Sequence, residues 1–207
     1  MERDPKDIVR EGYDKVAIQY GENSGPFSNE AELNEFVNIV KPGGHILDAG
    51  CGLGEVARIL VGKGFKVTGI DISQKMIELA GQRAPEAEFE VGDMSALESD
   101  DEAFDGIVST YSVFHVPRIG HIDLFKEFHR VLKEGGALLF SIGTTEADGV
   151  WVWEELQSVP MFWSYYPPPK TIELLESAGF EIVFARPVQI VFAGEDETHF
   201  WILAKRL

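Results

Sequence analysis

The stretch ILDAGCGLGE, residues 46–55, decides the fold of this chain. A short apolar run and the acidic Asp48 are followed by three glycines at alternate positions, Gly50, Gly52 and Gly54. Glycine loses more conformational freedom on folding than other residues, so this spacing indicates a backbone that a ligand approaches closely. In open α/β sheets, ligands bind beyond the carboxyl ends of the strands, where such loops lie. The stretch therefore predicts a strand, a ligand-binding loop and the start of a helix.

Apolar runs alternate with amphipathic stretches along most of the chain. Strands are expected at 45–49, 66–70, 87–91, 104–109 and 136–142, and helices at 3–20, 54–62, 73–83 (with Ser73 as N-cap), 120–132 and 170–178. A further helix is expected to run through Val40, behind a capping box of Asn29 and Glu32. Strands that alternate with helices indicate a parallel sheet covered on both faces.

The C-terminal end has a different pattern. The β-like runs FEIVFARPVQI (180–190) and HFWILAKR (199–206) are joined by AGEDET, which is typical of an antiparallel hairpin. We therefore expect an α/β fold, a doubly wound and mostly parallel sheet with an antiparallel C-terminal strand and helices on both faces. One domain is expected to cover residues 1–207.

Composition excludes several classes of function. The chain has 207 residues, a formal net charge of −17 and one cysteine, Cys51. A protein that binds duplex nucleic acid needs a cationic surface, so no nucleic-acid partner is expected. No segment is long and apolar enough to span a bilayer, and the N-terminus has no apolar signal core, so no membrane partner is expected. A single cysteine forms no intrachain disulfide and favours a cytoplasmic location, and no residue spacing is typical of a metal site.

The glycine loop resembles motif I of the class I S-adenosylmethionine-dependent methyltransferases, a family with a Rossmann-like fold. The resemblance continues through nearly the whole chain, in the order GIDIS (69–73), VGDM (91–94), FDGIVSTYSVFHV (104–116) and FHRVLKEGGALLFSI (128–142). The last of these has Glu134 where the family usually has proline, which alters only a turn. By this resemblance the sheet has seven strands in the order 3-2-1-4-5-7-6.

The resemblance implies that S-adenosylmethionine is the cofactor. Asp71 would bond the ribose hydroxyls, Asp93 the adenine amino group and the N–H of Met94 a ring nitrogen, while Ile72 would pack on the adenine. Asp48 would contact the amino group of the ligand or only fix amides of the loop. No lysine or arginine occurs from 46 to 57, which suits a ligand without phosphate. The expected cofactor-binding residues are Tyr20, Asp48, Gly50, Cys51, Gly52, Gly54, Asp71, Ile72, Met76, Asp93, Met94 and Thr110.

The acceptor site is expected at two further segments. Residues 1–40 resemble the helical cap of many members of the family, and residues 143–169 are rich in aromatic side chains, which predicts a lid; the alternative is an extra helix packed on the sheet edge. His115, after the fourth strand, is a candidate general base, and the alternative is a histidine that only packs. The expected acceptor-binding residues are Tyr13, Tyr111, Trp163 and Tyr166.

The predicted function is transfer of a methyl group from S-adenosylmethionine to a small-molecule acceptor by direct in-line displacement. Two alternatives stay open. Residues 52–57 also match the dinucleotide pattern G-x-G-x-x-A, with Asp71 lying 19 residues beyond Gly52, which is compatible with a nicotinamide-dependent oxidoreductase. A non-catalytic S-adenosylmethionine-binding regulator would carry the same motifs.

Overall fold

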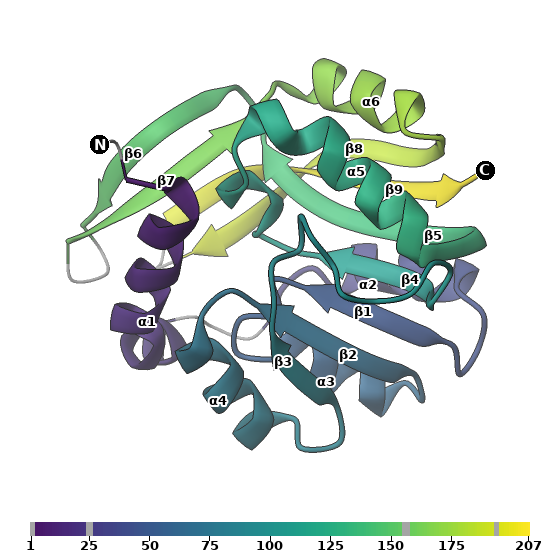
Figure 1. Ribbon diagram of the computed structural model, residues 1–207, viewed down its shortest axis with the longest axis horizontal. Helices are drawn as coiled ribbons and strands as arrows, with labels where there is room; N and C mark the ends of the chain where they lie inside the picture. The colour runs from purple at the N-terminus through teal and green to yellow at the C-terminus, as the bar shows by residue number, and fades with distance from the viewer. Residues whose placement is uncertain (1–2, 24–26, 155–157, 193–194) are drawn as a thin grey trace.

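A computed structural model describes residues 3–23, 27–154, 158–192 and 195–207, and its centre is a seven-stranded sheet (Figure 1). The strand order is β3-β2-β1-β4-β5-β9-β8. The strands are β1 His45–Ala49, β2 Lys66–Asp71, β3 Glu88–Val91, β4 Phe104–Ser109, β5 Leu132–Gly143, β8 Phe180–Phe192 and β9 Glu195–Arg206. Strand β9 runs antiparallel to both of its neighbours, β5 and β8, and the other neighbouring strands of this sheet are parallel to each other. Counted within this sheet, the order is the expected 3-2-1-4-5-7-6.

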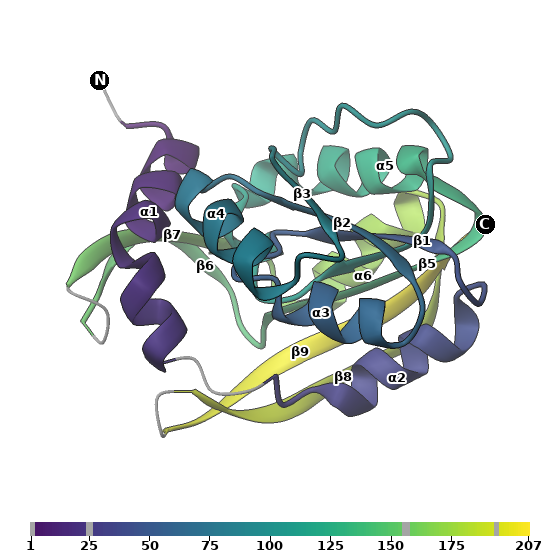
Figure 2. The same cartoon turned by 90° about the horizontal axis from the view of Figure 1, so that it is seen from below.

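Helices cover both faces of the sheet (Figure 2). They are α1 Pro5–Asn23, α2 Glu30–Ile39, α3 Glu55–Gly62, α4 Gln74–Arg83, α5 His121–Val131 and α6 Pro168–Ser177, with the short 3₁₀ turns η1 Val113–His115 and η2 Arg118–Gly120. Successive strand residues point to opposite faces. Leu47 accordingly packs in the cluster of α5 and α6, and Ile46 packs in the cluster of α2 and α3. The chain therefore folds as the alternating pattern predicts.

The N-termini of α4 and α2 test the two capping predictions. Ser73 is the N-cap of α4, and its hydroxyl accepts the N–H of Met76 at 3.1 Å, as expected. The predicted capping box at α2 is wrong, because Asn29 makes no side-chain cap bond there. Its Oδ1 accepts the hydroxyl of Tyr111, and Glu32 binds Arg186 at 2.9 Å. Partners distant in the sequence have replaced the local pair.

Between β5 and α6, the described residues form two strands where the alternative was an extra helix. Strand β6, Ala147–Trp153, pairs antiparallel with β7, Val159–Tyr165, in a separate two-stranded sheet beside α1 (Figure 1). Val159 packs on Val16 of α1, and Met161 packs with Ile8 and Val9. Residues 155–157, and residues 193–194 within the predicted AGEDET turn, lie outside the described residues. This hairpin and α1 together stand at one end of the main sheet.

No helix in the described part of the chain has the length and apolar character needed to cross a bilayer. Among the same residues, no three His, Cys, Asp or Glu side chains are grouped as they would be to hold a metal ion.

Candidate active site

A cavity of about 1030 Å³ lies at the carboxyl ends of the parallel strands. Its floor is formed by the loop after β1, the end of β2 and the residues after β4 and β5. Side chains of α1 and of the β6–β7 hairpin line its other walls. This is the position at which open α/β sheets bind their ligands.

The glycine loop forms part of the floor. Gly50, Gly52 and Gly54 have φ angles of +76°, +51° and +76°, in the left-handed region that favours glycine. A Cβ on Gly50 would clash with the side chain of Ser112, whereas a Cβ on Gly52 would meet nothing within 4 Å. Gly52 thus leaves its backbone open to the cavity. Gly54 lies outside the described lining and is the N-cap of α3.

Asp71 ends β2 and faces the cavity. Its Oδ2 accepts the N–H of Gly52 at 2.9 Å, and its Oδ1 accepts the N–H of Ser73 at 2.9 Å. Burial raises the pKa of Asp71 to about 6, although these two hydrogen bonds favour the charged form. Each carboxylate oxygen has two lone pairs, so both keep capacity for a further donor such as a hydroxyl group.

Asp48 lies beneath the loop and not in the described lining of the cavity. Its side chain is buried, and its Oδ2 has no hydrogen-bond partner. Burial raises its pKa to about 7, and a hydrogen bond from the backbone N–H of Ala57, in the first turn of α3, opposes this rise. Asp48 thus accepts a backbone amide of α3, and its contact with the amino group of the ligand stays a prediction. Cys51 lines the cavity beside it, and burial raises the pKa of its thiol well above the ordinary value.

Asp93 lies in the connection after β3 and already has several partners. Its Oδ1 accepts the N–H and the hydroxyl of Ser95 at 2.9 and 2.6 Å, and its Oδ2 accepts the ammonium of Lys6 from α1. Burial acts to raise the pKa of Asp93, but the bonds from Lys6 and Ser95 outweigh it and hold the pKa below the ordinary value. Lys6 thus already binds one oxygen of the carboxylate that the family resemblance would give to the adenine amino group.

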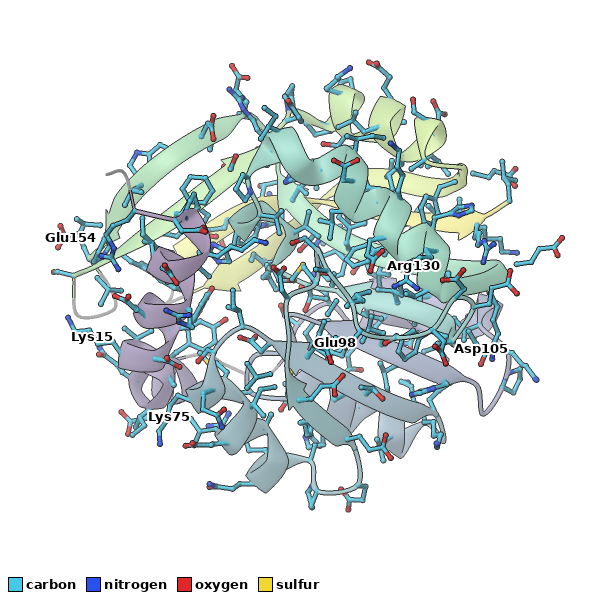
Figure 3. The ribbon with its side chains drawn as sticks, in the orientation of Figure 1. Lys15, Lys75, Glu98, Asp105, Arg130 and Glu154 are labelled. Carbon is cyan, nitrogen blue, oxygen red and sulfur yellow. The ribbon has the colours of Figure 1, made fainter. Side chains whose placement is uncertain are left out.

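The connection that carries Asp93 and Met94 is itself held from α5. Arg130, labelled in Figure 3, donates to the carbonyl oxygens of Ser99 and Leu97 at 2.9 and 3.1 Å. The apolar side chains that line this part of the cavity are Ile72, Met76 and Met94.

Tyr13 and His115 form a hydrogen-bonded pair on the cavity wall. The Tyr13 hydroxyl lies 2.8 Å from Nε2 of His115, and Nδ1 of His115 lies 2.7 Å from the carbonyl oxygen of Phe162. A carbonyl oxygen only accepts, so Nδ1 carries the proton and Nε2 accepts from Tyr13. Burial lowers the pKa of His115 to about 4, so the imidazole is neutral at pH 7. Burial raises the pKa of Tyr13 well above its ordinary value.

Aromatic rings continue the wall from this pair. Trp153 contacts Tyr13 and Tyr20 at centroid distances of 6.2 and 6.0 Å, and Trp163 lies 5.9 Å from Trp153. Burial raises the pKa of Tyr20 to about 12. Tyr20, Trp153 and Trp163 all line the cavity, as do Thr110 and Tyr111 after β4.

Tyr166 lies outside the described lining, in contrast to the expectation for an acceptor wall. The guanidinium of Arg118 lies 5.2 Å from its ring centroid, and His121 packs edge-on against it at 6.2 Å. Its neighbour Tyr165 lines the cavity instead. Adjacent residues at the end of a strand point to opposite sides. This explains why Tyr165 faces the cavity and Tyr166 does not.

Sequence reasoning missed Lys6, Phe114 and two residues of β9, Glu197 and His199, all of which line the cavity. Strand β9 begins at Glu195, earlier than expected, so its first residues reach the site. Nε2 of His199 lies 3.1 Å from Glu197. The run ETHFW, 197–201, has three polar residues before Phe200, so no alternation of polar and apolar residues signalled this earlier start.

Comparison with known proteins places this site in a family. Residues 46–136 match a family model described as a methyltransferase domain. The chain is 26% identical to a solved SAM-dependent methyltransferase from Methanosarcina mazei, with a TM-score of 0.72 over 83% of this chain and 96% of that one. Both comparisons support the resemblance of this chain to the class I S-adenosylmethionine-dependent methyltransferases. The solved relative is named as SAM-dependent, which favours S-adenosylmethionine over the nicotinamide cofactor of the alternative.

Two curated relatives illustrate the range of this methyltransferase family. Demethylmenaquinone methyltransferase of Symbiobacterium thermophilum is 32% identical over 145 residues, which are 63% of this chain and 57% of that protein. Phosphoethanolamine N-methyltransferase 1 of Arabidopsis thaliana is 35% identical over 134 residues, which are 62% of this chain and 27% of that protein. The matched regions thus span less than two thirds of either relative.

Proposed function

We propose that this protein transfers a methyl group from S-adenosylmethionine to a neutral small-molecule acceptor. The observation that carries the proposal is the open backbone of Gly52 bonded at 2.9 Å to Asp71, in the same cavity as the Tyr13–His115 pair. Gly52 and Asp71 suit the binding of a cofactor, and Tyr13 and His115 suit the transfer of a proton.

The residues of the floor fit S-adenosylmethionine in their chemistry. Exposed backbone at Gly52 suits the amino-acid end of the molecule, and the remaining lone pairs of Asp71 suit two ribose hydroxyls. The apolar side chains of Ile72, Met76 and Met94 suit the adenine ring. Among the described residues, Asp71 is bound by uncharged backbone amides and not by a cation, so a positively charged ligand is favoured over an anionic one. When bound, S-adenosylmethionine supplies a methyl group on a positively charged sulfur.

The chain contributes mainly alignment and the exclusion of water. Because α1 and the β6–β7 hairpin wall the cavity, an acceptor between them is held against the floor away from bulk solvent. Charge disperses during a methyl transfer from a sulfonium, so the reaction does not demand a strong acid or base.

In this proposal the Tyr13–His115 pair accepts the proton that the acceptor loses. The Tyr13 oxygen keeps lone pairs beyond its bond to His115, and these accept the proton of the acceptor while the Tyr13 proton moves to Nε2. The Nδ1–H bond to Phe162 then stabilises the imidazolium. Because the pKa of His115 is about 4, the pair accepts protons from groups that the reaction makes strongly acidic, such as a hydroxyl gaining a methyl group.

The charges in the cavity favour a neutral acceptor. The described lining includes four acids, Glu55, Asp71, Asp93 and Glu197. Of its two basic side chains that are always charged, Lys6 is bound to Asp93 and Ser95, and the other is Arg83. A phosphate group would therefore meet more acids than bases. Although one relative is named for phosphoethanolamine, the other, named for demethylmenaquinone, has the acceptor type that this cavity suits better.

Turnover tests the proposal. The purified protein is incubated with S-adenosylmethionine and a panel of neutral phenols, quinols and alcohols, and formation of S-adenosylhomocysteine is followed. Release that depends on one acceptor class is the expected result. Cofactor binding without turnover on any of these would make the protein a non-catalytic binder.

A further inference from the structure

Three tryptophans lie on one face of the β6–β7 hairpin. The register pairs Gly149 with Trp163 and Trp151 with Met161, and the period of two along a strand places Trp153 on the same face as Trp151. The ring of Trp151 folds over Gly149, since a Cβ at that glycine would lie 3.3 Å from it. The glycine thus gives Trp151 room to lie beside Trp163, at a centroid distance of 6.3 Å.

This row of tryptophans runs from the reacting groups to the solvent. Its inner members contact the proton-accepting pair, with Trp163 at 5.8 Å from His115 and Trp153 at 6.2 Å from Tyr13. Its outer member, Trp151, is 48% exposed although it also lines the cavity. Its neighbour Val152 is 52% exposed and also lines the cavity, so apolar surface is exposed at this edge of the cavity, as it is at ligand-binding grooves.

We propose, on the basis of the function proposed above, that the acceptor is an elongated molecule. Its reactive end lies beside Tyr13 and His115, and its apolar remainder lies along Trp163 and emerges over Trp151. The ring centroids of His115 and Trp163 are 5.8 Å apart, and those of Trp163 and Trp151 are 6.3 Å apart. An acceptor that reacts beside His115 must therefore extend past both rings to cover Trp151. A compact polar acceptor would leave this surface bare.

The surroundings of the row support an apolar occupant. Asp148 lies on the opposite face of β6 from Trp151, where it is bonded to Ser164 at 2.7 Å and to Arg118 at 3.3 Å, so this charged pair does not meet a ligand on the row. The cavity, at about 1030 Å³, is also at the upper end of the size that one drug-sized ligand fills. It has room for an acceptor in addition to the cofactor.

A series of 4-n-alkylphenols from methyl to hexyl tests the proposal. Their dissociation constants are measured by calorimetry in the presence of saturating S-adenosylhomocysteine. Affinity should rise by up to about fourfold for each methylene group that is buried on the row. Trp151→Ser should remove this gain for the longer phenols and leave 4-methylphenol unchanged.

Val150→Ser is the matched control. Val150 is also 48% exposed on β6 but lies outside the described lining, so this variant should bind the whole series as the parent does. Affinity that does not depend on chain length, or an equal loss in both variants, would overturn the proposal. If Trp151→Ser does not fold, Trp151→Gln serves in its place.

The same titrations separate this proposal from the proposed function. Binding of S-adenosylhomocysteine is measured first on each protein, and the phenol series is repeated without it. A parent that binds no S-adenosylhomocysteine contradicts the proposed function. A parent that binds it but shows no dependence on alkyl length contradicts only the elongated acceptor.

Discussion

The hydroxyl of Tyr13 lies 2.8 Å from Nε2 of His115 and joins α1 to η1 across 102 positions of the chain. Two further contacts hold the same helix against the cavity: Lys6 binds Asp93, and Asp14 accepts the hydroxyl of Ser73 at 2.6 Å. The helix that lines one wall of the cavity therefore also carries a member of the Tyr13–His115 pair. In the proposed function, both the exclusion of water and the proton transfer depend on this helix.

Replacing Tyr13 by phenylalanine should separate these two roles. Tyr13→Phe keeps the ring that packs on Tyr20 and Trp153 but removes the hydroxyl bonded to His115. The single-turnover rate should fall by about 10²-fold or more, the usual contribution of a positioned proton acceptor. The affinity for S-adenosylhomocysteine should stay within about fivefold of the parent, since a lost hydrogen bond between uncharged groups costs about 1 kcal/mol. A variant that turns over at the parent rate would show that the pair only packs.

Asp71→Ala should weaken binding of S-adenosylhomocysteine at least about tenfold, because hydrogen bonds to a charged group contribute about 1.5–3 kcal/mol each. Asp123→Asn is the control, since that carboxylate is 80% exposed on α5, outside the described cavity lining. Calorimetric titration of both variants, with circular dichroism to check the fold, gives the answer. Equal affinities in the parent and a folded Asp71→Ala variant would reduce Asp71 to a residue that fixes the loop.

The buried Asp48 predicts a pH dependence of stability. Its pKa is raised to about 7 in the folded protein, whereas an aspartate in an unfolded chain has a pKa of about 3.9. Between these values the folded state binds the extra proton, so the contribution of Asp48 to stability falls as pH rises from about 4 to 7. His115 and His121, whose pKa values are lowered to about 4, contribute stability that is lost as pH falls below about 6.5.

Asp48→Asn isolates the carboxylate, because both histidines titrate alike in the variant and in the parent. The variant should gain stability relative to the parent as pH rises from 5 to 8, by about 1 kcal/mol or more, measured by urea unfolding. A difference between the two proteins that does not change with pH would show that Asp48 has an ordinary pKa.

Lys6→Gln should loosen the N-terminal turn of α1 without unfolding the protein. The ammonium and the Asp93 carboxylate are 40% and 31% exposed, so solvent screens the pair and its loss should cost less than about 1 kcal/mol in global stability. Amide hydrogen exchange in α1 should become faster. Lys15→Gln, on the outer side of the same helix in Figure 3, is the control and should leave the exchange unchanged. Equal exchange rates in all three proteins would show that Lys6 does not hold the helix.

The sequence predicted the elements whose formation depends on local patterns. The apolar run before Asp48, the left-handed glycines and the Ser73 cap each act over a few residues, so β1, the loop and α4 could be placed from the chain alone. Family resemblance then supplied the order of the strands. The position of the cavity followed from that order.

The errors share a physical cause, which is competition from residues distant in the sequence. The Asn29–Glu32 capping box was lost because Glu32 binds Arg186, 154 positions away. Lys6 was overlooked because nothing near it in the sequence indicates its partner Asp93, 87 positions away. The prediction named Tyr166 where Tyr165 lines the cavity. The face to which a strand residue points depends on the pairing register, and the aromatic composition of the segment does not reveal that register.

Calorimetric titration of the unmodified protein with S-adenosylhomocysteine, and separately with NAD, tests the central claim most directly. The open backbone at Gly52 beside Asp71, with no lysine or arginine from 46 to 57, predicts saturable 1:1 binding of S-adenosylhomocysteine and no measurable heat with NAD. Saturable binding of NAD together with no binding of S-adenosylhomocysteine would contradict the account.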